Sequence, residues 1–151
     1  GKMVCQSFGI MNYASKLAGV YPKDDFVALK AEEVKGCLDD TFNLIEPTFF
    51  EPDAAKKLAM RKELVDGKLS ERLEMLEKLL VNNGTKHSVC DEITSADLEL
   101  YVFAWTLSAG ILDGIPTDII AAYQRISALS QAVAEHPKVD KWNKDHPFPP
   151  T

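Results

Sequence analysis

The segment that begins at Ile93 constrains the fold more than any other part of the chain. Thr94 can cap a helix there, and Asp97, three residues later, can accept a hydrogen bond from the Thr94 backbone, which is the capping-box arrangement. Ile93 and Leu98 occupy the two positions of a hydrophobic staple around that cap. Residues 100–112 carry no charge, so a helix here is apolar on nearly every side. Such a helix is predicted to lie at the centre of a core.

The rest of the chain is also predicted to be helical, because its apolar residues recur at steps of three and four. Helices are expected over 7–18, 25–45, 52–81, 117–129 and 131–143, the last with an interruption near Pro137. Pro47 is expected to end or bend the second of these, Gly67 to kink the third and Gly84 to stop it. Apart from a strand residue or two at the start, the pattern predicts an all-α bundle of about five or six helices.

The length, net charge and cysteine content of the chain exclude several classes of protein. The chain has 151 residues, and its net charge of -6 leaves no basic footprint for nucleic acid. No apolar run reaches the roughly 20 residues of a membrane span, and no secretory leader is apparent. The three cysteines are an odd number without paired spacing, which is typical of reduced thiols in a cytoplasmic protein. One domain, or one domain and a fragment, is expected.

No self-contained catalytic or metal site is evident in the sequence. His87, His136 and His146 are far apart, and neither a Cys-x-x-Cys pair nor a phosphate-binding loop occurs. We therefore assign no catalytic residue and no metal ligand.

Gln6 and Ser7 stand at the start of the first predicted helix. Free backbone N–H groups at a helix start attract anions, and a hydroxyl and an amide beside them suit a carboxylate. On physical grounds alone, the simpler interpretation is that Ser7 only caps the helix.

Three motifs resemble those of the cytosolic glutathione transferases. The segment Gln-Ser-Phe-Gly-Ile-Met-Asn-Tyr, residues 6–13, is similar to the one that closes the family's thioredoxin-like domain. Residues 91–97, Asp-Glu-Ile-Thr-Ser-Ala-Asp, resemble the opening of its central helix, and Arg125-Ile126 with His136-Pro137 and Trp142 resembles its closing pattern. In order and spacing the motifs cover nearly the whole chain, and the sigma class, within the alpha, mu, pi and sigma group, is the most similar.

The resemblance implies a domain organisation and an activity. Residues 1–20 would be the incomplete end of the thioredoxin-like glutathione-binding domain, and residues 21–151 the helical C-terminal domain. The intact protein would be a dimeric detoxification enzyme that conjugates glutathione, its substrate, to hydrophobic electrophiles. No residue here corresponds to the family's thiol-activating Tyr, Ser or Cys, so catalysis by this chain alone is uncertain.

The resemblance also implies binding residues. Gln6 and Ser7 match positions that hold the γ-glutamyl end of glutathione, and Asp40 matches a carboxylate that reaches the partner subunit's glutathione, with Asp39 as the alternative. Phe49 and Phe50 match the hydrophobic substrate pocket, although they could equally be core residues. The other function left open is a non-catalytic binding or assembly module with the same helical domain. Retention of Gln6 and Ser7 favours the enzyme, because a scaffold does not need residues that bind the carboxylate of glutathione.

Overall fold

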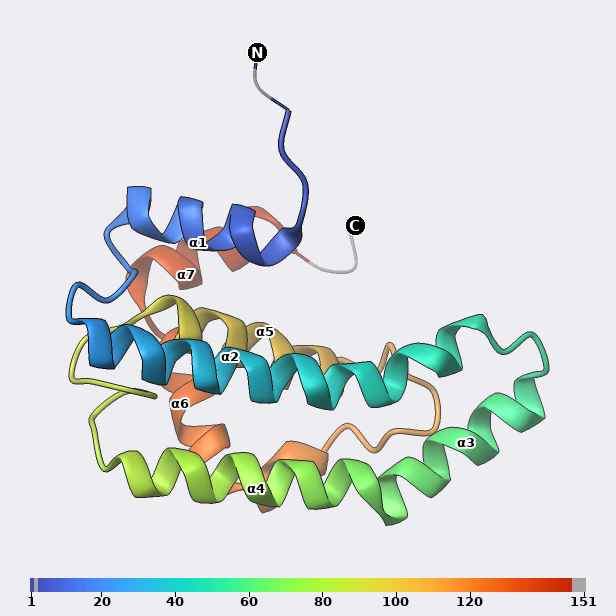
Figure 1. The fold of residues 1–151 in the computed structure, drawn as a ribbon. Helices are drawn as coiled ribbons and strands as arrows, with labels where there is room; N and C mark the ends of the chain where they lie inside the picture. The colour runs from blue at the N-terminus through green and yellow to red at the C-terminus, as the bar shows by residue number, and fades with distance from the viewer. Residues whose placement is uncertain (2, 148–151) are drawn as a thin grey trace.

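The computed structural model describes residues 1 and 3–147, and every regular secondary-structure element within them is a helix (Figure 1). The α-helices are α1 (Ser7–Ala18), α2 (Asp25–Ile45), α3 (Ala54–Asp66), α4 (Lys68–Asn83), α5 (Ser95–Ser108), α6 (Gln124–Ala134) and α7 (Pro137–Asp145), and the 3-10 helices are η1 (Glu46–Phe50) and η2 (Ile119–Ala122). The predicted all-α fold is confirmed, and α2 to α7 form the bundle.

The N-terminal cap of α5 forms as the sequence predicts. Asp97 is 0% exposed, and its carboxylate accepts hydrogen bonds from the backbone N–H of Thr94 at 2.8 Å and of Ser88 at 2.7 Å. The Thr94 hydroxyl also donates to it, at 2.9 Å. Ile93 and Leu98, the predicted staple pair, are both half-buried. The cap matters here because donors at a buried helix end cannot turn to water.

Helix α5 lies at the centre of the bundle, as its apolar sequence predicts. It packs against α2 and α6, while α4 contacts α2, α3 and α6 (Figure 1). Leu100 and Leu107 of α5 are almost fully buried, as are Val34 of α2 and Leu73 of α4. Burial of each such leucine contributes about 1.5–3 kcal/mol.

A second carboxylate caps α6 from a neighbouring helix. Glu77 of α4 accepts the backbone N–H of Arg125 at 2.7 Å and of Ile126 at 3.0 Å. The Arg125 guanidinium donates to the backbone carbonyls of Thr85, Lys86 and His87. The pair Glu77 and Arg125 therefore joins α4, α6 and the loop that leads to α5.

Three of the predicted elements were wrong in detail. The helix expected over 52–81 is two helices, because Gly67, at φ -143° and ψ -107°, breaks it outright. The helix expected over 117–129 is divided by Tyr123, whose backbone is extended, into η2 and α6. In the segment 131–143 the expected interruption near Pro137 occurs, but the bounds differ. Residues 131–134 belong to α6, and Pro137 begins α7, since proline at the first helical position needs no N–H donor. No strand occurs among the described residues at the start of the chain, where residues 3–6 lack a partner strand.

Replacing Asp97 by alanine is predicted to destabilise the fold by about 3 kcal/mol, because buried donors of Ser88 and Thr94 lose their acceptor. Urea denaturation measures the change in the free energy of unfolding. Asp91→Ala is the control: Asp91 is exposed and accepts one backbone bond, from Lys86 at 3.0 Å, so a loss of about 1 kcal/mol or less is expected. Equal losses of stability in the two variants would contradict the prediction that the buried Asp97 cap contributes more than an exposed carboxylate.

Candidate functional site

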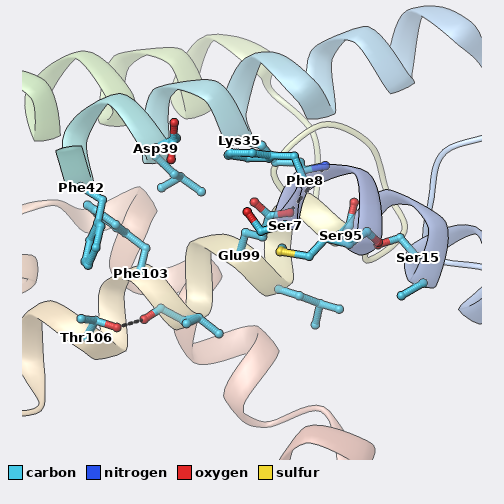
Figure 2. A pocket seen from close by; sticks show the side chains of 15 residues that line it. Ser7, Phe8, Ser15, Lys35, Asp39, Phe42, Ser95, Glu99, Phe103 and Thr106 are labelled. Carbon is cyan, nitrogen blue, oxygen red and sulfur yellow. Dashed lines mark hydrogen bonds and ion pairs between the residues drawn. The ribbon is translucent and has the colours of Figure 1, made fainter. Parts of the chain in front are cut away.

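A cavity of about 640 Å³ lies between α1, α2 and α5 (Figure 2). Its walls are mostly apolar, with a smaller group of polar side chains. The apolar lining includes Phe8, Met11, Leu38, Phe42, Leu98, Val102 and Phe103, and the polar lining consists of Ser7, Ser15, Lys35, Asp39, Ser95, Glu99 and Thr106. A concave, largely apolar site with a few polar groups is the usual form of a small-molecule site.

Lys35 is the buried cation beside this cavity, with an exposed fraction of 1%. It pairs with Glu32 of its own helix at 3.0 Å and donates a hydrogen bond to the Asn12 side chain of α1. Its Nζ also lies 3.5 Å from Glu99 Oε1 of α5. One ammonium thus links α1, α2 and α5.

Glu99 of α5 is the acidic partner of Lys35 in this 3.5 Å contact. Burial raises the pKa of its carboxyl above the ordinary value, and the nearby Lys35 charge offsets this only in part, while Glu32 and Asp39 add to the rise. Glu99 therefore holds its proton to a higher pH in the folded chain than in the unfolded one.

Helix α1 rests on the bundle without burying any of its own residues. At its start, Gln6 has φ 76° and ψ 106°, the only positive φ of a non-glycine residue in the described part of the chain. Such a conformation costs about 1–3 kcal/mol and is found mainly at functional sites. Ser7 is the first residue of α1 and no side chain caps the helix there, so the simpler interpretation of Ser7 as a cap was wrong.

The structure brings some of the expected site residues together and leaves others apart. Ser7 and Asp39 line the cavity, whereas Asp40, the next residue, is exposed and does not. Phe49 and Phe50 lie in η1, beyond the far end of α2, with exposed fractions of 43% and 80%. Neither lines this cavity, so their role in substrate binding stays a prediction.

The sequence analysis missed Lys35, Ser95 and Glu99. A signal existed for two of them. Lys35 follows Val34 on the apolar stripe of its helix, and Glu99 is the last charge before the uncharged run of α5. A charge inside an apolar stripe is buried only when it is paired, which points to a partner on another helix. Ser95 left no comparable signal.

The described residues contain neither a membrane-spanning helix nor a cluster of metal ligands. No helix there is long and apolar enough to cross a membrane. No group of three or more His, Cys, Asp or Glu side chains among them could hold a metal ion.

Comparison with known proteins places the chain among relatives by sequence. The sequence model described as "Glutathione S-transferase, C-terminal domain" matches residues 39–146. The chain is 23% identical over 155 residues to Glutathione S-transferase 1 of Ascaris suum, covering 99% of this chain and 72% of that protein. It is 28% identical over 149 residues to S-crystallin SL11 of Nototodarus sloanii, covering 93% of this chain and 67% of that one.

Solved structures agree with the sequence matches. Prostaglandin synthase D of Nilaparvata lugens superposes with a TM-score of 0.85 at 25% identity, over 99% of this chain and 72% of that one. The glutathione S-transferase of Ascaris lumbricoides superposes with a TM-score of 0.76 at 22% identity, over 100% and 73%, and so shares the fold.

Replacing Glu99 by glutamine is predicted to change how stability depends on pH. Because the folded pKa of Glu99 is raised, the native state binds more protons than the unfolded state once the pH exceeds the ordinary value of 4.5, and stability then falls as the pH rises through the folded pKa. Glutamine does not titrate, so the free energy of unfolding of Glu99→Gln should improve, relative to the parent, as the pH rises above the ordinary value of 4.5.

Urea denaturation at several pH values measures that difference, in which all other titrating groups cancel. The exposed Glu74 of α4 supplies the control variant, Glu74→Gln, which should change much less over the same range. A Glu99→Gln difference that stays flat or worsens with pH would contradict the burial of an ionisable carboxyl here.

Proposed function

The chain belongs to the glutathione S-transferase C-terminal domain family, and on that basis we propose that the intact protein is a glutathione transferase. It would conjugate the glutathione thiolate to hydrophobic electrophiles, as a homodimer in the cytoplasm. The observation that carries the proposal is the position of Ser7, at the rim of a large apolar cavity and directly after the strained residue Gln6.

The glutathione end of this site rests on Gln6 and Ser7. Both are exposed at the start of α1, where free backbone N–H groups and the helix dipole favour an anion. The γ-glutamyl carboxylate is the group that this arrangement would hold. The unusual backbone of Gln6 would be maintained because it directs the amide and hydroxyl toward the same anion.

The electrophile would occupy the cavity beside Ser7. Its apolar walls suit a hydrophobic molecule, and Phe42 and Phe103 offer aromatic faces. The glutathione sulfur, as thiolate, forms a bond to the electrophilic carbon, and that carbon's leaving group departs with its electron pair. Phe49 and Phe50, exposed beyond the end of α2, would extend the contact surface for larger substrates.

The domain division and the dimer are part of the same proposal. Residues 1–20 would end a thioredoxin-like domain, and residues 21–151 would be the helical domain. The thiol-activating group would then come from outside this sequence. Asp40, exposed and turned from the cavity lining, is available to reach the glutathione of a partner subunit, whereas Asp39 would serve its own.

A conjugation assay with 1-chloro-2,4-dinitrobenzene tests this function on the 151-residue chain and on the longest product of its gene. We expect turnover only in a product that includes a thioredoxin-like domain. In that product, Ser7→Ala is predicted to raise KM for glutathione about tenfold with kcat little changed, because a binding contact is lost. Ser130→Ala on α6, away from the cavity, is the control.

Turnover by the chain alone would place a thiol-activating group within it and contradict the domain division. Absence of both turnover and glutathione binding in the longest product would favour the non-catalytic binding or assembly module.

A further inference from the structure

Lys35 places a positive charge on the buried side of α2. The residue is 1% exposed, and it lies between Val34 and Leu38, two residues of the hydrophobic core. Lysine is almost never buried this fully unless its charge is paired, because an unpaired ammonium inside a protein is very costly. An apolar side chain of similar size would often be as stable here as a paired charge. The ammonium therefore points to a role other than filling space.

The three donors of the ammonium serve three different helices. The Lys35 Nζ lies 3.0 Å from Glu32 of its own helix α2 and 3.5 Å from Glu99 of α5. It also donates a hydrogen bond to Oδ1 of Asn12, in the middle of α1. The two carboxylates balance the charge within the bundle, and the remaining donor is directed to α1.

Helix α1 depends on this contact more than the other helices depend on any one contact. It has 12 residues, none of them buried, and within the described part of the chain it belongs to no closely packed helix pair. Isolated helices of about 12–15 residues or fewer are marginal in water. Among the described residues, the bond from Lys35 to Asn12 is the only hydrogen bond that joins α1 itself to the bundle.

A second attachment lies just beyond the C-terminal end of α1. The Val20 carbonyl accepts the backbone N–H of Ser95, at the start of α5, at 2.9 Å. With this bond alone, α1 could pivot about Val20, and the contact at Asn12 removes that freedom. Ser7 lies five residues before Asn12, about 7.5 Å along the helix axis. A pivot would therefore displace Ser7 further than Asn12.

We propose that Lys35 is a positioning residue, which acts through Asn12 to fix α1 on the bundle and so sets where Gln6 and Ser7 lie relative to α2 and α5. For the reaction, this inference rests on the proposed function, whereas the attachment of α1 does not. Loss of the link leaves the contacts of each substrate in place but shifts one substrate against the other. A misplacement of about 1 Å can lower a reaction rate about 100-fold.

Hydrogen exchange in the 151-residue chain tests the attachment without any assay of activity. Asn12→Ala removes the acceptor on α1 and leaves Lys35 paired with Glu32 and Glu99, so the bundle should fold normally. Amides over residues 7–18 are expected to exchange at least about tenfold faster, the size of one hydrogen bond to a charged group, with those of α5 unchanged. Alanine favours helix more than asparagine does, so propensity alone predicts slower exchange.

Two further variants serve as matched comparisons. Asn12→Asp offers a carboxylate to the same ammonium and should keep the protection of α1. Lys16→Ala changes an exposed residue one turn later, whose Nζ lies over the ring of Tyr21 at 4.8 Å, and it should leave exchange over residues 7–13 within about twofold of the parent.

Conjugation kinetics in the longest gene product test the positioning role. Asn12→Ala is expected to lower kcat about tenfold and to change KM for glutathione less than about twofold, because orientation is lost while the glutathione contacts remain. Asn12→Asp should restore kcat. Lys35→Met should lower kcat to a similar extent, and adding Asn12→Ala to it should have little further effect, since the two residues act through one contact.

Each outcome decides a separate claim. Unchanged exchange over α1 in Asn12→Ala, or an Asn12→Asp variant that behaves like Asn12→Ala, would overturn the attachment. A longest gene product that conjugates normally, with kcat unaffected by Asn12→Ala, would overturn the positioning role and leave the transferase function intact. Absence of conjugation in the parent would instead count against the transferase function, and the exchange experiment would still decide whether Lys35 holds α1.

Discussion

The fold depends on one buried carboxylate, that of Asp97. A helix as apolar as α5 must lie inside the bundle, yet its N-terminus carries donors that need acceptors away from water. The Asp97 carboxylate accepts the backbone N–H of Thr94 at the N-cap and also that of Ser88, while the Val20 carbonyl accepts the N–H of Ser95, so the preceding loop and the central helix are fixed together. The packing of α2 and α6 against α5 follows from that placement, and α4 packs in turn against α2 and α6.

The candidate site depends on a different kind of contact. Helix α1 buries no residue and is joined to the bundle through the polar link from Asn12 to Lys35. The residues proposed to hold glutathione are thus carried by α1, while most of the apolar residues that line the cavity belong to α2 and α5. Affinity for the two substrates would respond to different parts of the molecule.

The bundle could be predicted from the sequence further than the site could. The cap at Thr94 and Asp97 and the limits of α1 and α2 are local signals, written in neighbouring residues. The break at Gly67 was underestimated because a single glycine is often tolerated in a helix. The cavity was missed since Lys35 and Glu99 are 64 positions apart in sequence, and periodicity reports a helix's own face but not its neighbour.

The clamp that Arg125 forms has a consequence for how such a sequence can diverge. Its guanidinium binds three main-chain oxygens and no side chain of the turn. The exposed Lys86 can therefore be replaced freely during evolution, provided that the backbone path is kept. Arg125 and Glu77 are more constrained, because Arg125 supplies the donor for the three carbonyls and Glu77 uses both of its oxygens to accept the N–H groups of Arg125 and Ile126. Among relatives with this architecture we expect the side chain at Lys86 to vary and the residues at Arg125 and Glu77 to be retained.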